Sequence, residues 1–192
     1  MWPTFSKRTR QRASSFTTCL LTVVVVFGGI GFYYFRYFQW RHFETPTEGL
    51  TYVKGGTAPQ LNDFRKMTVS KIIDATSGQL GRLKEIRKAT KKGTVKYTDF
   101  EQDCIEVRNR LLEIMNEARL RRIPEKFKKK YETVLKSIAL TYRSVNVLEG
   151  SFDAETPEAR KKEYIESIKL AKKANRGLEV TREYFYGTAW SQ

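Results

Sequence analysis

The chain has 192 residues, two cysteines, and 36 Lys and Arg residues against 21 Asp and Glu residues, which gives a formal net charge of +15. This length allows one domain with a core of its own, and a disulfide scaffold is excluded because Cys19 lies in an apolar run and Cys104 in a predicted helix. The positive charge favours anionic partners, such as lipid headgroups, polyanionic polymers, nucleic acid or an acidic protein, without indicating a fold.

An uncharged apolar run extends from Phe16 to Phe35, and a helix of about 20 such residues crosses a bilayer. The run is longer than the apolar region of a cleavable signal peptide, and no small-residue cleavage site follows it. We therefore predict a basic tail over residues 1–15 and an uncleaved, single-pass signal anchor over 16–35. The aromatic cluster after the run favours the headgroup layer, with Tyr37 and Trp40 as candidate interfacial anchors.

The orientation of this anchor follows from the positive charge at its two ends. Four basic residues precede the run, whereas Arg36 and Arg41 follow it, so the positive-inside rule predicts a cytoplasmic N-terminus and an exported domain. The first 43 residues lack Asp and Glu and are rich in Arg, Ser and Thr, which also fits a mitochondrial presequence. The mitochondrial inner membrane is therefore the alternative, although residues 7–15 have almost no apolar face.

Residues 36–59 are predicted to be an aromatic juxtamembrane segment and a linker. Within them, residues 44–59 are rich in Thr, Gly and Pro and show no sustained period of 2 or 3.6. We expect no regular structure there, and a spacer short enough to hold the next domain near the bilayer. A helical domain is predicted over 60–187, followed by a C-terminal tail over 188–192.

The first two helices of this domain have different local signals. The first is expected from about residue 60 to 92, and Gly78 and Gly81 interrupt it. Each glycine costs a helix about 1 kcal/mol relative to alanine, so the sequence leaves open whether the helix is continuous there or has a kink or break. The second helix begins with a capping-box pattern at Thr98 and Glu101. Its apolar positions recur at steps of four and three at Phe100, Cys104, Val107, Leu111, Ile114 and Ala118.

Pro124 is predicted to start the third helix, which ends at Gly150, and Thr156 is predicted to cap the fourth, which ends at Gly187. The third helix repeats the four-and-three pattern at Phe127, Tyr131, Val134, Ile138, Tyr142, Val145 and Leu148. The apolar positions of the fourth are Ile165, Ile168, Ala171, Leu178 and Phe185. This pattern predicts an all-α domain, an antiparallel four-helix bundle with short connections. The alternative is a long coiled-coil hairpin with a docked fourth helix, because a coiled-coil seam has the same spacing.

The connection between the second and third helices is strongly basic. If the first helix leads away from the membrane, this turn returns to it, where basic residues attract anionic headgroups. A solvated charged turn is the ordinary alternative. The candidate anionic-surface contacts are Arg119, Arg121, Arg122, Lys126, Lys128, Lys129 and Lys130.

The fourth helix ends in aromatic residues that return to the same side. Tyr184, Tyr186 and Trp190 are candidate interfacial anchors. The alternative is that these rings close the open end of the bundle, since Phe185 follows the core stripe.

Chemistry-bearing motifs are few. His42 is the single histidine of the sequence, which excludes a di-iron site of the Glu-x-x-His type, a c-type haem motif and most zinc sites. No glycine-rich phosphate loop is present. We assign no catalytic residue, no metal ligand and no cofactor.

These features favour a bitopic, non-enzymatic interaction or scaffold protein whose basic domain binds a protein partner or an anionic surface such as membrane lipid. The alternative is a cytoplasm-facing domain that tethers nucleic acid or an acidic protein to the membrane. Nucleic acid is disfavoured because Phe127 is the main aromatic residue in the basic turn. The sequence does not identify the protein partner, and it leaves self-association open.

Overall fold

The computed structural model describes residues 43–91 and 96–187. By its contacts the chain divides at residue 42, and only the second unit, Phe43–Gln192, is described below. The predicted tails, the anchor over 16–35 and the candidate anchors Tyr37, Trp40 and Trp190 lie outside the described residues. Among the helices that are described, none is both long and apolar enough to cross a membrane.

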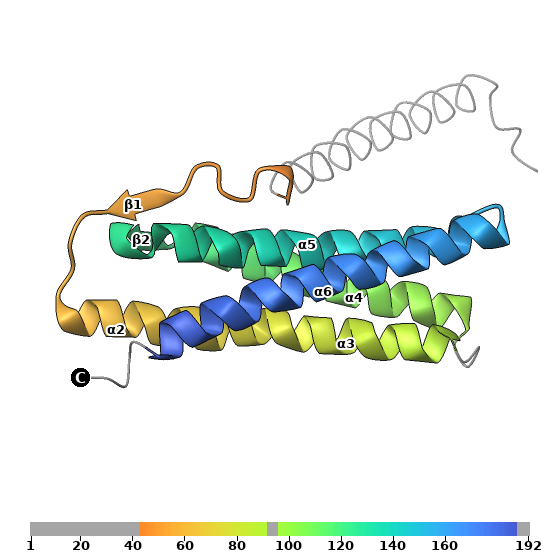
Figure 1. Cartoon of the computed structure of the whole chain (residues 1–192), viewed down its shortest axis with the longest axis horizontal. Coiled ribbons are helices and arrows are strands. Elements are labelled where there is room, and N and C mark those ends of the chain that lie inside the picture. Colours follow the sequence, from red (N-terminus) through yellow and green to blue (C-terminus); the bar gives the residue numbers. More distant parts are fainter. Residues whose placement is uncertain (1–42, 92–95, 188–192) are drawn as a thin grey trace, which may run out of the picture. The chain divides into compact units, whose positions relative to one another are not determined.

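The described residues are mostly helical, as predicted for an all-α domain. Three segments follow one another without a break, namely α2 (Ala58–Met67), the π-helix η1 (Thr68–Ile73) and α3 (Asp74–Lys91). They are followed by α4 (Tyr97–Arg119), α5 (Lys128–Asp153) and α6 (Pro157–Gly187). Successive long helices run in opposite directions along one another (Figure 1), an arrangement that fits a helical bundle.

The helix is continuous at the two glycines, a point that the sequence left open. Helix α3 continues through Gly78 and Gly81, both of which are exposed, and an added Cβ atom at either would meet nothing within 4 Å. The irregular turn lies earlier, at η1, where Val69, Ile72 and Ile73 are all buried. A π-helical turn holds more residues than an α-helical turn, which allows this short apolar run to face the core on a wider arc.

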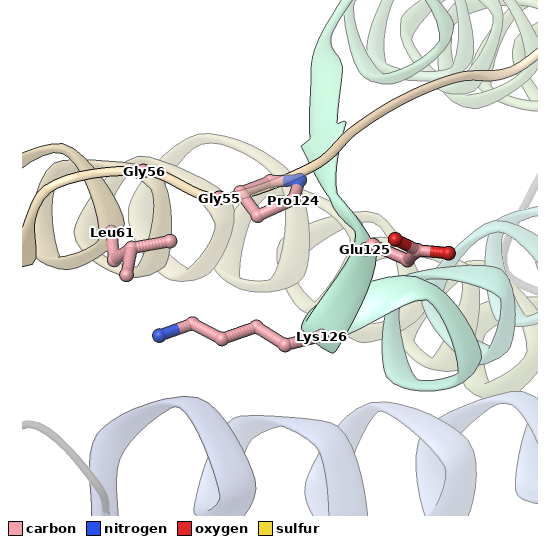
Figure 2. Close-up of a pocket in the computed structure, with 6 residues that line it drawn as sticks. All are labelled: Gly55, Gly56, Leu61, Pro124, Glu125 and Lys126. Atoms are coloured by element: carbon pink, nitrogen blue, oxygen red, sulfur yellow. The ribbon is translucent and has the colours of Figure 1, made fainter.

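The predicted linker contains regular structure that the sequence did not reveal. Strand β1 (Thr51–Val53) pairs in parallel with β2 (Arg122–Pro124), with Thr51 opposite Arg122. The chain then passes Pro124 at Gly55 (Figure 2). Two three-residue strands have no detectable period, and their pairing joins positions about 70 residues apart, so local patterns could not predict it.

The predicted helix starts are partly wrong. Pro124 has an extended backbone and belongs to β2, and α5 begins at Lys128 after the 3-10 turn η2 (Glu125–Phe127). Thr98 lies inside the first turn of α4, whose N-cap is Lys96. Thr156 caps α6 as predicted, since its hydroxyl accepts a hydrogen bond from the Ala159 amide at 3.2 Å.

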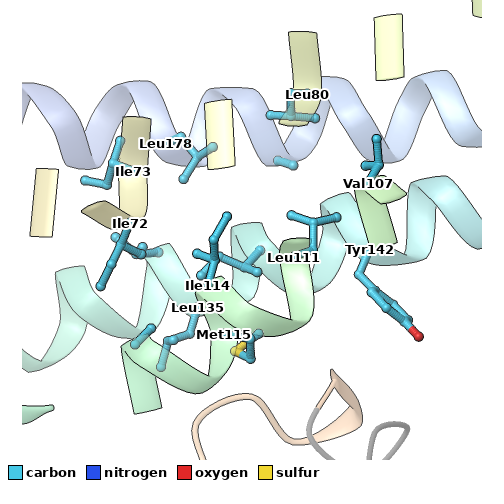
Figure 3. Packing of buried hydrophobic residues seen from close by; sticks show 14 of the residues in the cluster. Ile72, Ile73, Leu80, Val107, Leu111, Ile114, Met115, Leu135, Tyr142 and Leu178 are labelled. Carbon is cyan, nitrogen blue, oxygen red and sulfur yellow. The ribbon is translucent and has the colours of Figure 1, made fainter. Parts of the chain in front are cut away.

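The core confirms the predicted stripes of α4 and α5. Every stripe residue named above for these two helices is buried, and residues such as Ile72, Leu111 and Leu178 converge from different helices (Figure 3). The stripe predicted for α6 is wrong at Ile165, which is 42% exposed. The predicted positions Ala171, Leu178 and Phe185 are buried, and Ile168 is half-buried. Small and polar residues outside the predicted stripe are buried as well, namely Ser167, Ala174 and Thr181.

Small side chains bring α5 and α6 close together. The Ser144 hydroxyl donates to the Ser167 carbonyl oxygen at 2.7 Å, and the Ser167 hydroxyl donates to the Ser144 carbonyl oxygen at 2.8 Å. A Cβ atom on Gly177 would lie 2.3 Å from the Ser137 Oγ atom. Any larger residue at position 177 would therefore require the Ser137 hydroxyl to move.

Candidate functional site

The basic turn, residues 119–130, connects α4 to α5 and contains β2 and η2. All seven candidate anionic-surface contacts belong to it. Its backbone is held from inside, because Ile123 and Phe127 are 0% and 1% exposed. The structure thus presents the basic residues on a fixed turn that is anchored in the core.

A segment that we call the strap, residues 43–53, holds the turn from outside. The Phe43 ring stacks on the Tyr142 ring with 3.8 Å between their centroids. The Arg119 guanidinium donates to the carbonyl oxygens of Thr45, at 3.4 Å, and of Glu48. Strand β1 then completes the strap by pairing with β2. Arg119 is thereby directed toward the strap, and its burial lowers its pKa from the ordinary arginine value.

Aromatic rings form the inner wall of the turn. The Phe127 ring lies 5.5 Å from the centroids of both Phe64 and Phe185 and 6.3 Å from Tyr184. The Lys126 ammonium lies 5.1 Å from the centroid of the Phe127 ring. Lys128 lies 4.7 Å from the ring of Tyr52, and Lys130 lies 5.1 Å from the ring of Tyr184. Such contacts are each worth about 0.5–1 kcal/mol at exposed sites, enough to bias where the ammonium groups lie.

The seven predicted contacts divide into two groups by environment. Arg121 forms an ion pair with Glu117 at 2.6 Å, and Arg119 binds the strap. Lys130 is half-buried. Four cations remain exposed on the turn, namely Arg122, Lys126, Lys128 and Lys129.

The aromatic residues at the end of α6 also divide. Phe185 is 1% exposed, and the half-buried Tyr184 packs against it with 5.4 Å between ring centroids. These two rings close the end of the bundle, as the alternative interpretation predicted. Tyr186 is 45% exposed and keeps the exposure that an interfacial anchor needs.

One exposed residue of the turn was missed by sequence reasoning. Leu120 is 87% exposed, more than any other large apolar residue that the structure describes. The available signal was its place in the sequence. It falls off the stripe that ends at Ala118, and it stands between Arg119 and Arg121.

A pocket of about 450 Å³ adjoins the turn and is lined by Gly55, Gly56, Leu61, Pro124, Glu125 and Lys126 (Figure 2). Its two charged side chains, Glu125 and Lys126, have opposite sign. Within residues 43–91 and 96–187, no three His, Cys, Asp or Glu residues are grouped so as to hold a metal ion. His42 lies outside these ranges.

Comparison of the chain with protein-family models, with curated proteins and with solved structures finds no match.

Replacing Tyr52 with phenylalanine tests how the strap is held to α5. The Tyr52 hydroxyl donates to Glu132 Oε1 at 2.9 Å, and burial, followed by this carboxylate, raises the pKa of Tyr52 to about 12. Because the pKa is higher in the folded state, this stabilisation is present below pH ~10 and is lost as the pH rises through ~12. We expect Tyr52→Phe to lower the free energy of unfolding by about 1 kcal/mol at neutral pH.

The measurement is urea denaturation of the full chain in detergent at several pH values. The difference between Tyr52→Phe and wild type should shrink as the pH approaches 12. Tyr186→Phe is the control and should leave stability nearly unchanged. A Tyr52→Phe difference that stays constant with pH would contradict this role of the hydroxyl.

Proposed function

We propose that this chain is a single-pass, membrane-anchored, non-enzymatic interaction protein. Its anchor is the apolar run 16–35, and its exported domain is an antiparallel four-helix bundle that binds anionic lipid headgroups through the basic turn. The observation that carries the proposal is the group of four exposed cations on a turn held by the strap and the core.

The path of the chain supports this proposal. An anchor ending near residue 35 leaves residues 36–42 before the strap begins, and that stretch reaches at most about 25 Å when fully extended. The strap then leads from Phe43, at Tyr142, to β1, beside the basic turn. The first segment of the domain to follow the predicted anchor is therefore the strap, and the strap ends beside the basic turn.

The charges are sufficient for a membrane contact of moderate strength. A basic residue close to an anionic surface contributes about 1 kcal/mol, and this attraction declines over a Debye length of about 8 Å at physiological salt. Four exposed cations therefore predict a contact that depends on both anionic lipid and low ionic strength.

Energy transfer in lipid nanodiscs that each hold one full-length chain tests this contact. A donor dye at Glu125→Cys, with Cys19→Ala in the background, reports the distance from the turn to acceptor-labelled headgroups. Cys104 should not react, because its side chain is buried and burial raises its pKa to about 12. We expect stronger transfer with phosphatidylglycerol than with phosphatidylcholine alone, and weaker transfer at high salt.

The charge-specific variant replaces Arg122, Lys126, Lys128 and Lys129 with glutamine. It should lose the additional transfer seen with phosphatidylglycerol. The matched control replaces four exposed α6 lysines, Lys161, Lys162, Lys172 and Lys173, and should retain it. Equal transfer in both variants would remove the basic turn from the function.

Cysteine labelling of intact cells tests the orientation. The third helix was predicted to end at Gly150, but α5 extends to Asp153 and buries Ser151. Glu155 is exposed in the connection to α6, and it is therefore the position to label. Labelling of Glu155→Cys by an impermeant reagent is expected for an exported domain. Labelling only after lysis would favour the cytoplasm-facing alternative, in which the domain tethers nucleic acid or an acidic protein.

A further inference from the structure

Leu120 is exposed between two arginines that contact other parts of the protein. Leu120 is the C-cap of α4, and its amide donates to the Asn116 carbonyl oxygen at 3.2 Å. Arg119 is directed to the strap and Arg121 to Glu117. Both flanking guanidinium groups are therefore engaged with the protein, and the side chain between them is left 87% exposed.

This exposed leucine is held on a fixed backbone. Helix α4 precedes it, and β2, which is paired with β1, begins two residues later. Ile123 and Pro124 are buried three and four residues further along the chain. The backbone is thus held on both sides of Leu120, and its side chain offers apolar surface to a partner.

The chemistry around Leu120 matches the boundary between phosphate and hydrocarbon in a bilayer. The same turn exposes Arg122, Lys126, Lys128 and Lys129, and an apolar side chain combined with cations is typical of proteins that bind at the membrane interface. Single-stranded nucleic acid offers phosphates and stacking surfaces that favour aromatic side chains. Leucine offers no ring for stacking, so the bilayer is the better match.

We propose that Leu120 inserts below the phosphates of an anionic bilayer while the exposed cations of the turn bind those phosphates. This inference rests on the proposed function, because it requires the basic turn to meet lipid. Charge alone would hold the turn at the headgroup surface. Insertion of Leu120 would add an apolar contact below the phosphates.

The test places the environment-sensitive dye NBD at Leu120→Cys in the full chain with Cys19→Ala, again with one chain per nanodisc. With phosphatidylglycerol present, we expect the emission to shift to shorter wavelength and to be quenched by lipids that carry a spin label on the acyl chain. The control dye at Glu155→Cys, at the other end of α5, should show neither change. Helix α5 separates the two positions by roughly 40 Å.

Substitution at the same position provides a second measurement with the donor at Glu125→Cys. Leu120→Ser should reduce the ratio of docked to undocked chains at least about tenfold, because an exposed leucine loses its transfer into hydrocarbon. Leu120→Phe should retain docking. Ile165→Ser, which removes an exposed apolar residue from α6, is the matched control and should also retain it.

The outcomes separate this inference from the proposed function. In one outcome, energy transfer responds to salt and to phosphatidylglycerol, but the NBD emission is typical of water. This result would overturn the insertion of Leu120 and leave the charge contact in place. Absence of both signals would overturn the inference and the proposed contact together. An NBD shift that appears only with two chains per disc would assign Leu120 to a contact between copies and overturn insertion into lipid.

Discussion

Replacing Phe127 with alanine is expected to lower the free energy of unfolding by about 3–5 kcal/mol, the usual cost of removing a fully buried aromatic ring. Phe127 is 1% exposed and contacts rings from α2 and α6, including Phe64 and Phe185. The loss should be large because these rings come from separate helices and cannot all move into the space. Urea denaturation of the full chain in detergent, followed by circular dichroism, measures it.

Two further variants test whether the loss of stability comes from the buried volume of the Phe127 ring. Phe127→Leu keeps most of the apolar volume and should cost less than about 1.5 kcal/mol. Tyr186→Ala removes an exposed ring and should cost little. Phe127 also anchors the basic turn in the core. Phe127→Ala should therefore weaken the lipid contact that energy transfer measures. A loss of stability below about 1 kcal/mol would contradict the central position given to this ring.

The second large effect is expected at Gly177. Gly177→Ala should destabilise the protein by about 1–3 kcal/mol, the usual cost of overpacking, because the new Cβ atom would lie 2.3 Å from the Ser137 Oγ atom. This sign is opposite to the intrinsic preference of a helix for alanine over glycine. The Ser137 hydroxyl also donates to the Thr133 carbonyl oxygen at 2.9 Å, so moving it breaks a hydrogen bond.

A double-mutant cycle isolates this contact. In a Ser137→Ala background the nearest remaining atom of residue 137 would be its Cβ, at 3.6 Å, so Gly177→Ala should become neutral or stabilising. Gly78→Ala is the matched control in α3, where the added Cβ meets nothing within 4 Å, and it should stabilise by about 0.5–1 kcal/mol. Equal effects of Gly177→Ala in both backgrounds would show that residue 137 does not restrict the α5–α6 distance.

Sequence-based prediction is correct for this chain where the local apolar pattern and burial agree. The stripes of α4 and α5 are buried as predicted, because the helical period and the demand for an apolar core both act on residues close in sequence. It failed at Ile165 because the face of α6 that meets α5 is made of residues such as Ser167, Ala174 and Gly177, which an apolar pattern does not register. It failed at Pro124 because the partner strand lies far away in the sequence.

The candidate site was only partly predictable. The basic composition of residues 119–130 is visible in the sequence, and so is the i,i+4 spacing of Arg121 and Glu117. The contact of Arg119 with the strap is not, because its partners lie about 70 residues earlier in the chain. The position of Leu120 off the α4 stripe indicates exposure, but its exposed fraction of 87% comes only from the structure.

By itself, the sequence determined that the domain is all-α, which residues of α4 and α5 form its core, and that a basic turn joins these two helices. Only the tertiary structure decided that the strap crosses to that turn, and that Arg122, three lysines and Leu120 remain exposed on it. The physical reason is the range of the interactions. Helical periodicity and capping act over a few residues, whereas strand pairing and ion pairs between distant segments depend on how the whole domain packs.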